Sequence, residues 1–126
     1  MNIIDQYTIE GSDLGINGFD FKVKIEKDTY CTPDDADCYT PAQVRAWRND
    51  EWEYVSVTVT PTRHGVTVHG AAQSLAGTEY GEFLLTDDMD NITGSKSIGR
   101  PELLEYPIKE LAETAVAEAR ELISKL

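Results

Sequence analysis

The sequence predicts a single α+β domain over residues 1–126, in which a small antiparallel sheet of about three strands packs against a short helix and a long C-terminal helix. Two segments alternate apolar and polar residues with a period of two, and one segment near the C-terminus repeats apolar residues at helical spacing. A chain of 126 residues can bury a core without a metal ion or a disulfide. We therefore expect one domain, with both helices on one face of the sheet.

The predicted strands span residues 19–27, 53–61 and 66–75. The first alternates residues such as Phe21 and Val23 with charged neighbours, as expected for a strand with one buried face. The second and third are joined by a short connection that contains proline and glycine, which predicts a hairpin.

The remaining non-helical segments are less regular. Four apolar residues near the N-terminus predict a short edge strand: Ile3, Ile4, Tyr7 and Ile9. Three glycines then predict a loop: Gly11, Gly15 and Gly18. Residues 77–100 show no sustained period, and we expect them to be irregular.

The short helix is predicted to begin after Thr40 and to end near residue 48. Thr40 and Gln43 form a capping box, and Pro41 suits the first helical position because its missing N–H would have no partner there. Trp47 is expected to dock into the core from this helix. Trp52 follows at the start of the next strand, where we expect a partly exposed anchor for a partner.

The C-terminal helix is predicted from an apolar stripe that places one face against the sheet. The stripe consists of Ile108, Leu111, Ala112, Ala115, Val116, Ala119, Leu122, Ile123 and Leu126. The alanines allow the helix to lie close to the sheet. Four glutamates are expected on the outer face: Glu110, Glu113, Glu118 and Glu121.

The chain is strongly acidic, with 23 Asp and Glu against 11 Lys and Arg and a formal net charge of −12. Residues 1–75 and residues 76–126 each carry −6, so the acidity is not confined to a tail. A negative surface repels nucleic acid and attracts basic surfaces. Two interpretations remain open: the charge serves only to keep the protein in solution, or the surface mimics a nucleic-acid backbone.

No residue pattern predicts a catalytic, cofactor or metal site. Cys31 and Cys38 are separated by six residues, more than zinc motifs use, and neither His64 nor His69 completes a known spacing. The segment around residues 87–91 fails the calcium-loop template at its fifth and sixth positions. We therefore expect a protein that is not an enzyme and needs no cofactor.

The sequence contains no apolar run of about 18 residues and no secretory signal, which predicts a cytoplasmic protein without a membrane span.

Three stretches of the chain resemble a group of uncharacterised small acidic proteins of actinobacterial phages and mobile elements. They are WRNDEWEYVSVTVT, GVTVHGAAQSL and ELAETAVAEARELI, and the similarity covers about residues 44–80 and 108–124. Members often carry Leu-Trp-Gly-Ile-Glu where this chain has Leu-Ala-Gly-Thr-Glu at residues 75–79, so the aromatic residue is missing here. The resemblance implies a phage context but transfers no functional residue.

Charge and resemblance together favour a non-enzymatic phage inhibitor of a host defence nuclease, such as an anti-CRISPR or anti-restriction protein. Its acidic surface would occupy a basic groove of a nucleic-acid-handling host protein, without direct contact to nucleic acid or membrane. The candidate contacts are Trp52, Asp87, Asp88, Asp90, Glu110, Glu113, Glu118 and Glu121. The alternatives are a generic protein–protein adaptor or structural phage protein, and a small enzyme.

Overall fold

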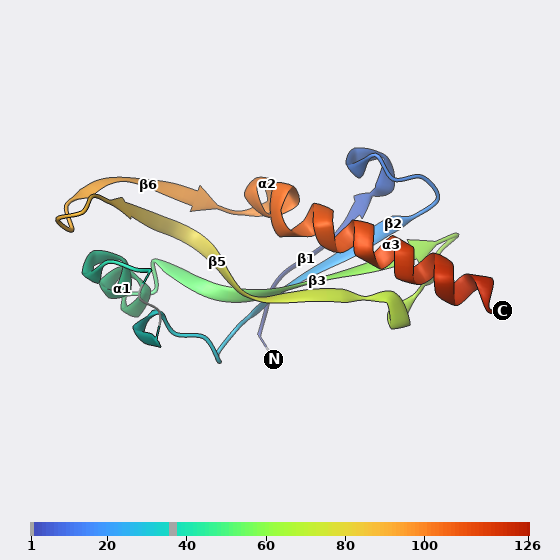
Figure 1. The fold of residues 1–126 in the computed structure, drawn as a ribbon, viewed down its shortest axis with the longest axis horizontal. Helices are drawn as coiled ribbons and strands as arrows, with labels where there is room; N and C mark the ends of the chain where they lie inside the picture. Colours follow the sequence, from blue (N-terminus) through green and yellow to red (C-terminus); the bar gives the residue numbers. More distant parts are fainter. Residues whose placement is uncertain (1, 36–37) are drawn as a thin grey trace.

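The computed structural model describes residues 2–35 and 38–126 and has the predicted α+β class (Figure 1). In the described part of the chain, six antiparallel strands form one curled sheet, twice the number predicted. Five of them follow the order β1-β2-β3-β5-β6, and β4 pairs with β3 beside this path. The strands are β1 (Ile3–Glu10), β2 (Asp20–Lys27), β3 (Trp52–Arg63), β4 (Val66–Thr67), β5 (Gln73–Thr86) and β6 (Ile92–Ile98).

The centre of the sheet is the antiparallel pair β2–β3, as the alternating patterns predict. Val23 lies opposite Val59 and Ile25 opposite Val57, and all four side chains are fully buried. The N-terminal edge strand is also confirmed, since β1 pairs along its length with β2. These contacts fix the register, because a shift by one residue would turn the buried side chains towards solvent.

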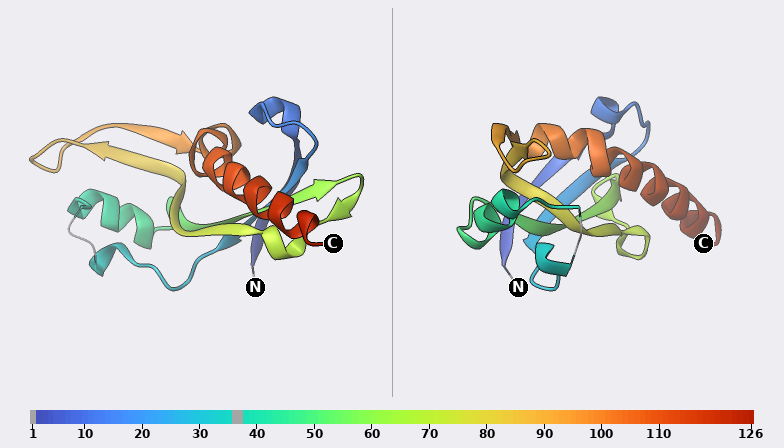
Figure 2. Two further views of the ribbon diagram at one scale, coloured as in Figure 1. Left: turned by 45° about the vertical axis from the view of Figure 1, so that its right-hand side comes forward. Right: turned by 60° about the vertical axis from the view of Figure 1, so that its left-hand side comes forward.

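The helices lie on opposite faces of the sheet, so the prediction of one helical face is wrong. Along β3, Trp52 and Tyr54 are buried on one face, whereas Val55, Val57 and Val59 are buried on the other. The helix α3 (Lys109–Ser124) covers the valines, and α1 (Pro41–Arg48) packs mainly on β5 beneath the opposite face (Figures 1 and 2). Each face of β3 is therefore covered over about half of the strand: one face at its start and the other face over its later part.

Residues 77–100 are mostly strand, which corrects the prediction of an irregular segment. Two glycines with positive φ, Gly77 (70°) and Gly81 (105°), interrupt the alternation of β5 near a bulge against β3. The edge strand β6 has exposed side chains on most positions and is held by backbone pairing with β5. The predicted strand 66–75 is in turn split by a 3₁₀ turn (His69–Ala71).

The C-terminal stripe forms a shorter helix than the pattern predicted, preceded by α2 (Arg100–Leu103). Tyr106 is extended (φ −158°, ψ 130°), as residues before proline commonly are, and it separates α2 from α3. Ala112, Ala115 and Ala119 are completely buried, so α3 does lie close to the sheet. Within the described residues no helix has the length and apolarity needed to cross a membrane.

An ion pair joins the first strand, β1, to the start of α2. The guanidinium of Arg100, the first residue of α2, donates two hydrogen bonds to Asp5 of β1 at 2.7 and 2.6 Å and lies 4.0 Å from the centre of the Tyr7 ring. The hydrogen bonds from Arg100 hold the pKa of the Asp5 carboxyl below its usual value, although burial opposes this. No pattern in the sequence near Asp5 or near Arg100 predicts that these two distant residues pair.

We expect Arg100→Ala to lower the free energy of unfolding at pH 7 by a small amount, because the Arg100 side chain is exposed to solvent and exposed ion pairs contribute little. A carboxyl with a lowered folded-state pKa stabilises the fold above its unfolded pKa of about 4, and this contribution is lost as pH falls further. The difference between wild type and Arg100→Ala should therefore shrink below about pH 4. Urea denaturation at several pH values measures this difference in the free energy of unfolding, and Asp5→Asn completes a double-mutant cycle. A difference that does not change with pH would contradict the stabilising pairing of Asp5 with Arg100.

Candidate partner-binding surface

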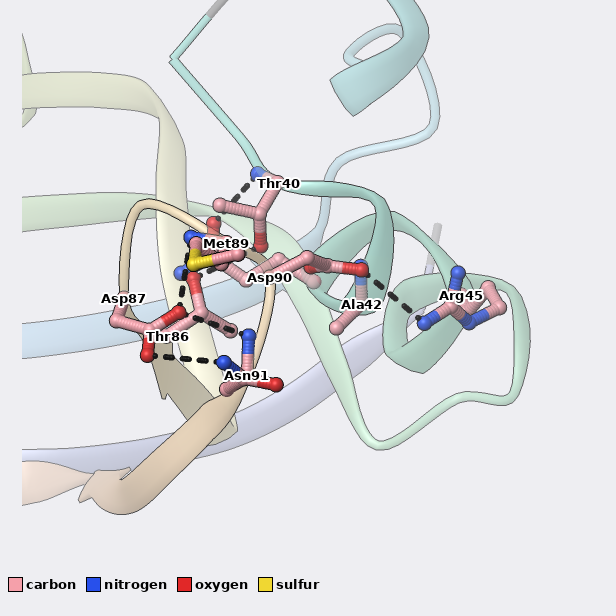
Figure 3. A network of polar contacts seen from close by, with 9 residues as sticks. Thr40, Ala42, Arg45, Thr86, Asp87, Met89, Asp90 and Asn91 are labelled. Atoms are coloured by element: carbon pink, nitrogen blue, oxygen red, sulfur yellow. Dashed lines mark hydrogen bonds and ion pairs between the residues drawn. The ribbon is translucent and has the colours of Figure 1, made fainter.

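The carboxylate of Asp87 accepts hydrogen bonds from other residues of the turn between β5 and β6 (Figure 3). It accepts hydrogen bonds from the backbone N–H of Met89 and of Asn91, both at 2.9 Å, and from the Asn91 side chain at 3.2 Å. These bonds, the Asn91 backbone N–H first among them, hold the pKa of Asp87 below its ordinary value. Asp87 is exposed, but its role in this structure is to form the turn.

Asp90 connects the same turn to the start of α1 (Figure 3). Its carboxylate accepts from the backbone N–H of Ala42 at 2.9 Å and lies 3.4 Å from the Arg45 guanidinium. The Ala42 N–H belongs to the first helical turn and has no acceptor within the helix. Asp88, by contrast, is exposed, and no hydrogen bond or ion pair to another described residue involves its side chain. Of the three predicted loop contacts, the structure thus leaves Asp88 available.

We expect Asp90→Ala to destabilise the fold by about 1–2 kcal/mol, because the α1 terminus loses an acceptor and a non-glycine residue remains at φ 62°. The matched change Asp88→Ala should be close to neutral. Hydrogen exchange provides the local measurement, since the Ala42 amide should exchange faster only in Asp90→Ala. Equal exchange in the two variants would show that Asp90 does not cap α1.

The four predicted glutamates of α3 are all exposed on the outer side of the helix. At 3.6 residues per turn they occupy an arc of roughly 140°, opposite the buried alanines. Glu121 lies 3.5 Å from Lys125 in a solvent-exposed pair, which is a weak interaction. In the described structure no ion pair involves the other three: Glu110, Glu113 and Glu118. We call these four glutamates the α3 face.

Trp52 lies in the core, which corrects the expectation of a partly exposed contact. Its side chain is 1% exposed, and its indole N–H donates to the carbonyl of Gln43 at 2.9 Å. The rings of Tyr54 and Phe83 pack edge-on against it, with centroids 5.2 and 5.1 Å away. Trp47 is half-buried and packs against the same cluster, so its predicted docking from the helix is confirmed in part. Trp52 shares its strand face with Tyr54 two residues later, and this spacing indicates a buried site for both.

The cysteines and histidines show no arrangement typical of a metal centre. The thiol of Cys31 donates to the Asp28 carboxylate at 3.4 Å, and burial raises its pKa, so it is a weak nucleophile. Cys38 and His64 are exposed at the surface. Among residues 2–35 and 38–126, no three His, Cys, Asp or Glu side chains are grouped as metal ligands would be.

A second surface feature, which no pattern in the sequence predicts, is an apolar groove of about 630 Å³ at one end of the sheet. It lies between the β3–β4 hairpin and the C-terminal end of α3, and Val66 and Leu122 line it with 65% and 38% of their surfaces exposed. The last residues of the apolar stripe extend past the sheet, so the helical pattern alone does not reveal their exposure.

Comparison of the chain with protein-family models, with curated proteins and with solved structures gave no match.

Proposed function

We propose that this protein is a non-catalytic binding protein whose α3 face engages the basic, nucleic-acid-binding surface of a partner. The observation that carries the proposal is the α3 face itself: four exposed glutamates, three without an ion pair among the described residues, in a chain of charge −12. Glu110 and Glu113, like Glu118 and Glu121, are neighbours about 5–6 Å apart between Cβ atoms. Closely spaced negative charges on a rigid helix suit a groove that ordinarily binds phosphates.

The resemblance to phage proteins supports a narrower form of this proposal. The partner is then a host defence nuclease, a CRISPR effector or a restriction enzyme, and the protein inhibits it by occupying the groove that binds nucleic acid. The acids contribute electrostatic steering, which mainly raises the association rate and is reduced by salt.

Affinity capture from a host lysate, followed by nucleic-acid displacement, tests the proposal. Two variants with equal net charge serve as matched baits. The helix variant carries Glu110→Gln, Glu113→Gln and Glu118→Gln. The control, which we call the arm variant, carries Asp13→Asn, Glu51→Gln and Glu82→Gln, all exposed, outside α3 and not among the candidate contacts. Each changes the formal charge from −12 to −9 by removing three acids.

We expect wild type and the arm variant to capture a nucleic-acid-binding protein and to displace its nucleic acid, and the helix variant to do so less well. Capture of a partner whose nucleic-acid binding is unaffected by the wild-type protein would contradict the proposal.

The apolar groove favours a second candidate function, a protein adaptor in which the charge serves only to keep the protein in solution. Exposed apolar patches on a domain often mark interaction sites. In that case the change Val66→Ser with Leu122→Ser would abolish capture of the partner, and the helix variant would bind as wild type does.

A further inference from the structure

A recess of about 460 Å³ lies beside the C-terminal end of α1, on the opposite face of the sheet from α3. It is bounded by residues 28–32, the last residues of α1 and the start of β3. Two aromatic side chains are accessible in its wall: Trp47 is half-buried and Tyr30 is 97% exposed. Trp47 packs partly against the core cluster around Trp52, and the rest of its surface is open to solvent in the recess.

Backbone contacts fix the walls of this recess. The Asp28 N–H donates to the carbonyl of Tyr54 at 2.9 Å, which attaches the first wall to β3. The Asp50 N–H donates to the carbonyl of Trp47 at 3.1 Å, and Asp50 has a positive φ of 60°, which reverses the chain after α1. The backbone of both walls is thus fixed before any ligand arrives.

The charges of the lining are three carboxylates and two bases. Burial alone would raise the pKa of Asp28, but hydrogen bonds from the backbone N–H of Tyr30 and Gly77 hold it below its usual value, so this side chain stays ionised. Both bases already have acidic partners: Arg48 lies 2.7 Å from Asp34, outside the lining, and Lys27 lies 3.9 Å from Glu53. The negative charges of Asp28 and Asp50 are left without a basic partner among the described residues.

We propose that this recess binds the guanidinium of an arginine side chain from a partner protein. A guanidinium is planar, is less strongly hydrated than an ammonium, and stacks on an aromatic face while its N–H groups donate to carboxylates. Trp47 supplies the face, and Asp28 and Asp50 supply the charge. An anionic ligand would be repelled by these carboxylates. An apolar ligand would displace water from them without supplying a counter-charge. The site is separate from the α3 face and does not rest on the function proposed above.

The test uses blocked tripeptides as probes and the two indole N–H signals in ¹H–¹⁵N NMR spectra. The probe is Gly-Arg-Gly; the control peptide replaces arginine with citrulline, which has nearly the same shape without the charge. We expect Gly-Arg-Gly to shift the Trp47 signal saturably, to leave the buried Trp52 signal in place, and to bind about fivefold more tightly than the citrulline peptide. A Gly-Lys-Gly peptide should bind more weakly than Gly-Arg-Gly, because a compact ammonium stacks less well.

The protein variant is Asp50→Asn, since asparagine tolerates a positive φ and leaves the turn intact. It should weaken Gly-Arg-Gly binding about fivefold, whereas the helix variant should bind as wild type does. Trp47→Leu, followed through the amide signals of residues 28–32, should bind more weakly as well. The proposal is overturned if the citrulline peptide binds as tightly as the arginine peptide, if the Trp47 signal does not move, or if Asp50→Asn binds with unchanged affinity. None of these outcomes bears on the α3 face, which the helix variant tests separately.

Discussion

Trp52→Ala should lower the free energy of unfolding by about 3–5 kcal/mol, which is the cost typical of removing a buried tryptophan. The indole is 1% exposed and contacts the rings of Tyr39, Tyr54 and Phe83. Its removal leaves a cavity and also deprives the Gln43 carbonyl of a donor, an additional cost in a buried site. A loss of this size is a large part of the total stability of a small domain.

The matched change is Trp47→Ala, for which we expect a loss of roughly 1 kcal/mol, because this side chain is only half-buried. Urea denaturation followed by far-UV circular dichroism suits both variants, since it does not depend on tryptophan fluorescence. A larger loss for Trp47→Ala than for Trp52→Ala would show that the sequence-based assignment of the two tryptophans, not the structural one, is right.

Gly11→Ala should be the second most damaging change, because a methyl group at this position has no space. An added Cβ would lie 1.9 Å from the carbonyl oxygen of Phe19 and 2.6 Å from that of Ile16. Both contacts are with backbone atoms, so the loop between β1 and β2 must move, and the hydrogen bond from the Ile16 N–H to the Gly11 carbonyl at 2.8 Å is disturbed with it. We expect a loss of about 3 kcal/mol, the upper end of overpacking effects.

Gly94→Ala is the control for this prediction, because an added Cβ there meets no atom within 4 Å and its φ is not in the left-handed region. Thermal unfolding of the two variants compares them directly. Comparable melting temperatures would mean that the loop before β2 does not have the tight conformation described.

The sequence predicts best those elements whose local pattern and tertiary environment agree. β2 and the C-terminal half of β3 have one buried face each, so Val23 and Val57 follow a strict period of two and their burial is predicted correctly. The start of α1 is likewise confirmed, because the Gln43 side chain accepts from the Thr40 N–H at 3.0 Å. Such local signals do not depend on knowing the rest of the fold.

The elements that were missed depend on distant parts of the chain. β6 has few apolar residues, and its conformation is set by backbone pairing with β5. The burial of Trp52 requires α1 to lie on the face opposite α3, which no single segment specifies. The candidate contacts show the same division. The exposure of the α3 glutamates follows from helical spacing alone. The hydrogen bond that Asp90 accepts from Ala42 depends on the position of α1, 48 positions away in the chain.

The most direct test of the proposed function is the association rate of the helix variant with the captured partner, measured beside the arm variant at low and at physiological salt. Both variants have the same net charge, so a difference between them reports the location of the acids and not their number. We expect the helix variant to associate severalfold more slowly than the arm variant at low salt, and the difference to shrink at higher salt as exposed charges are screened over about 8 Å. Equal association rates for the two variants at both salt concentrations would contradict a binding role for the α3 face.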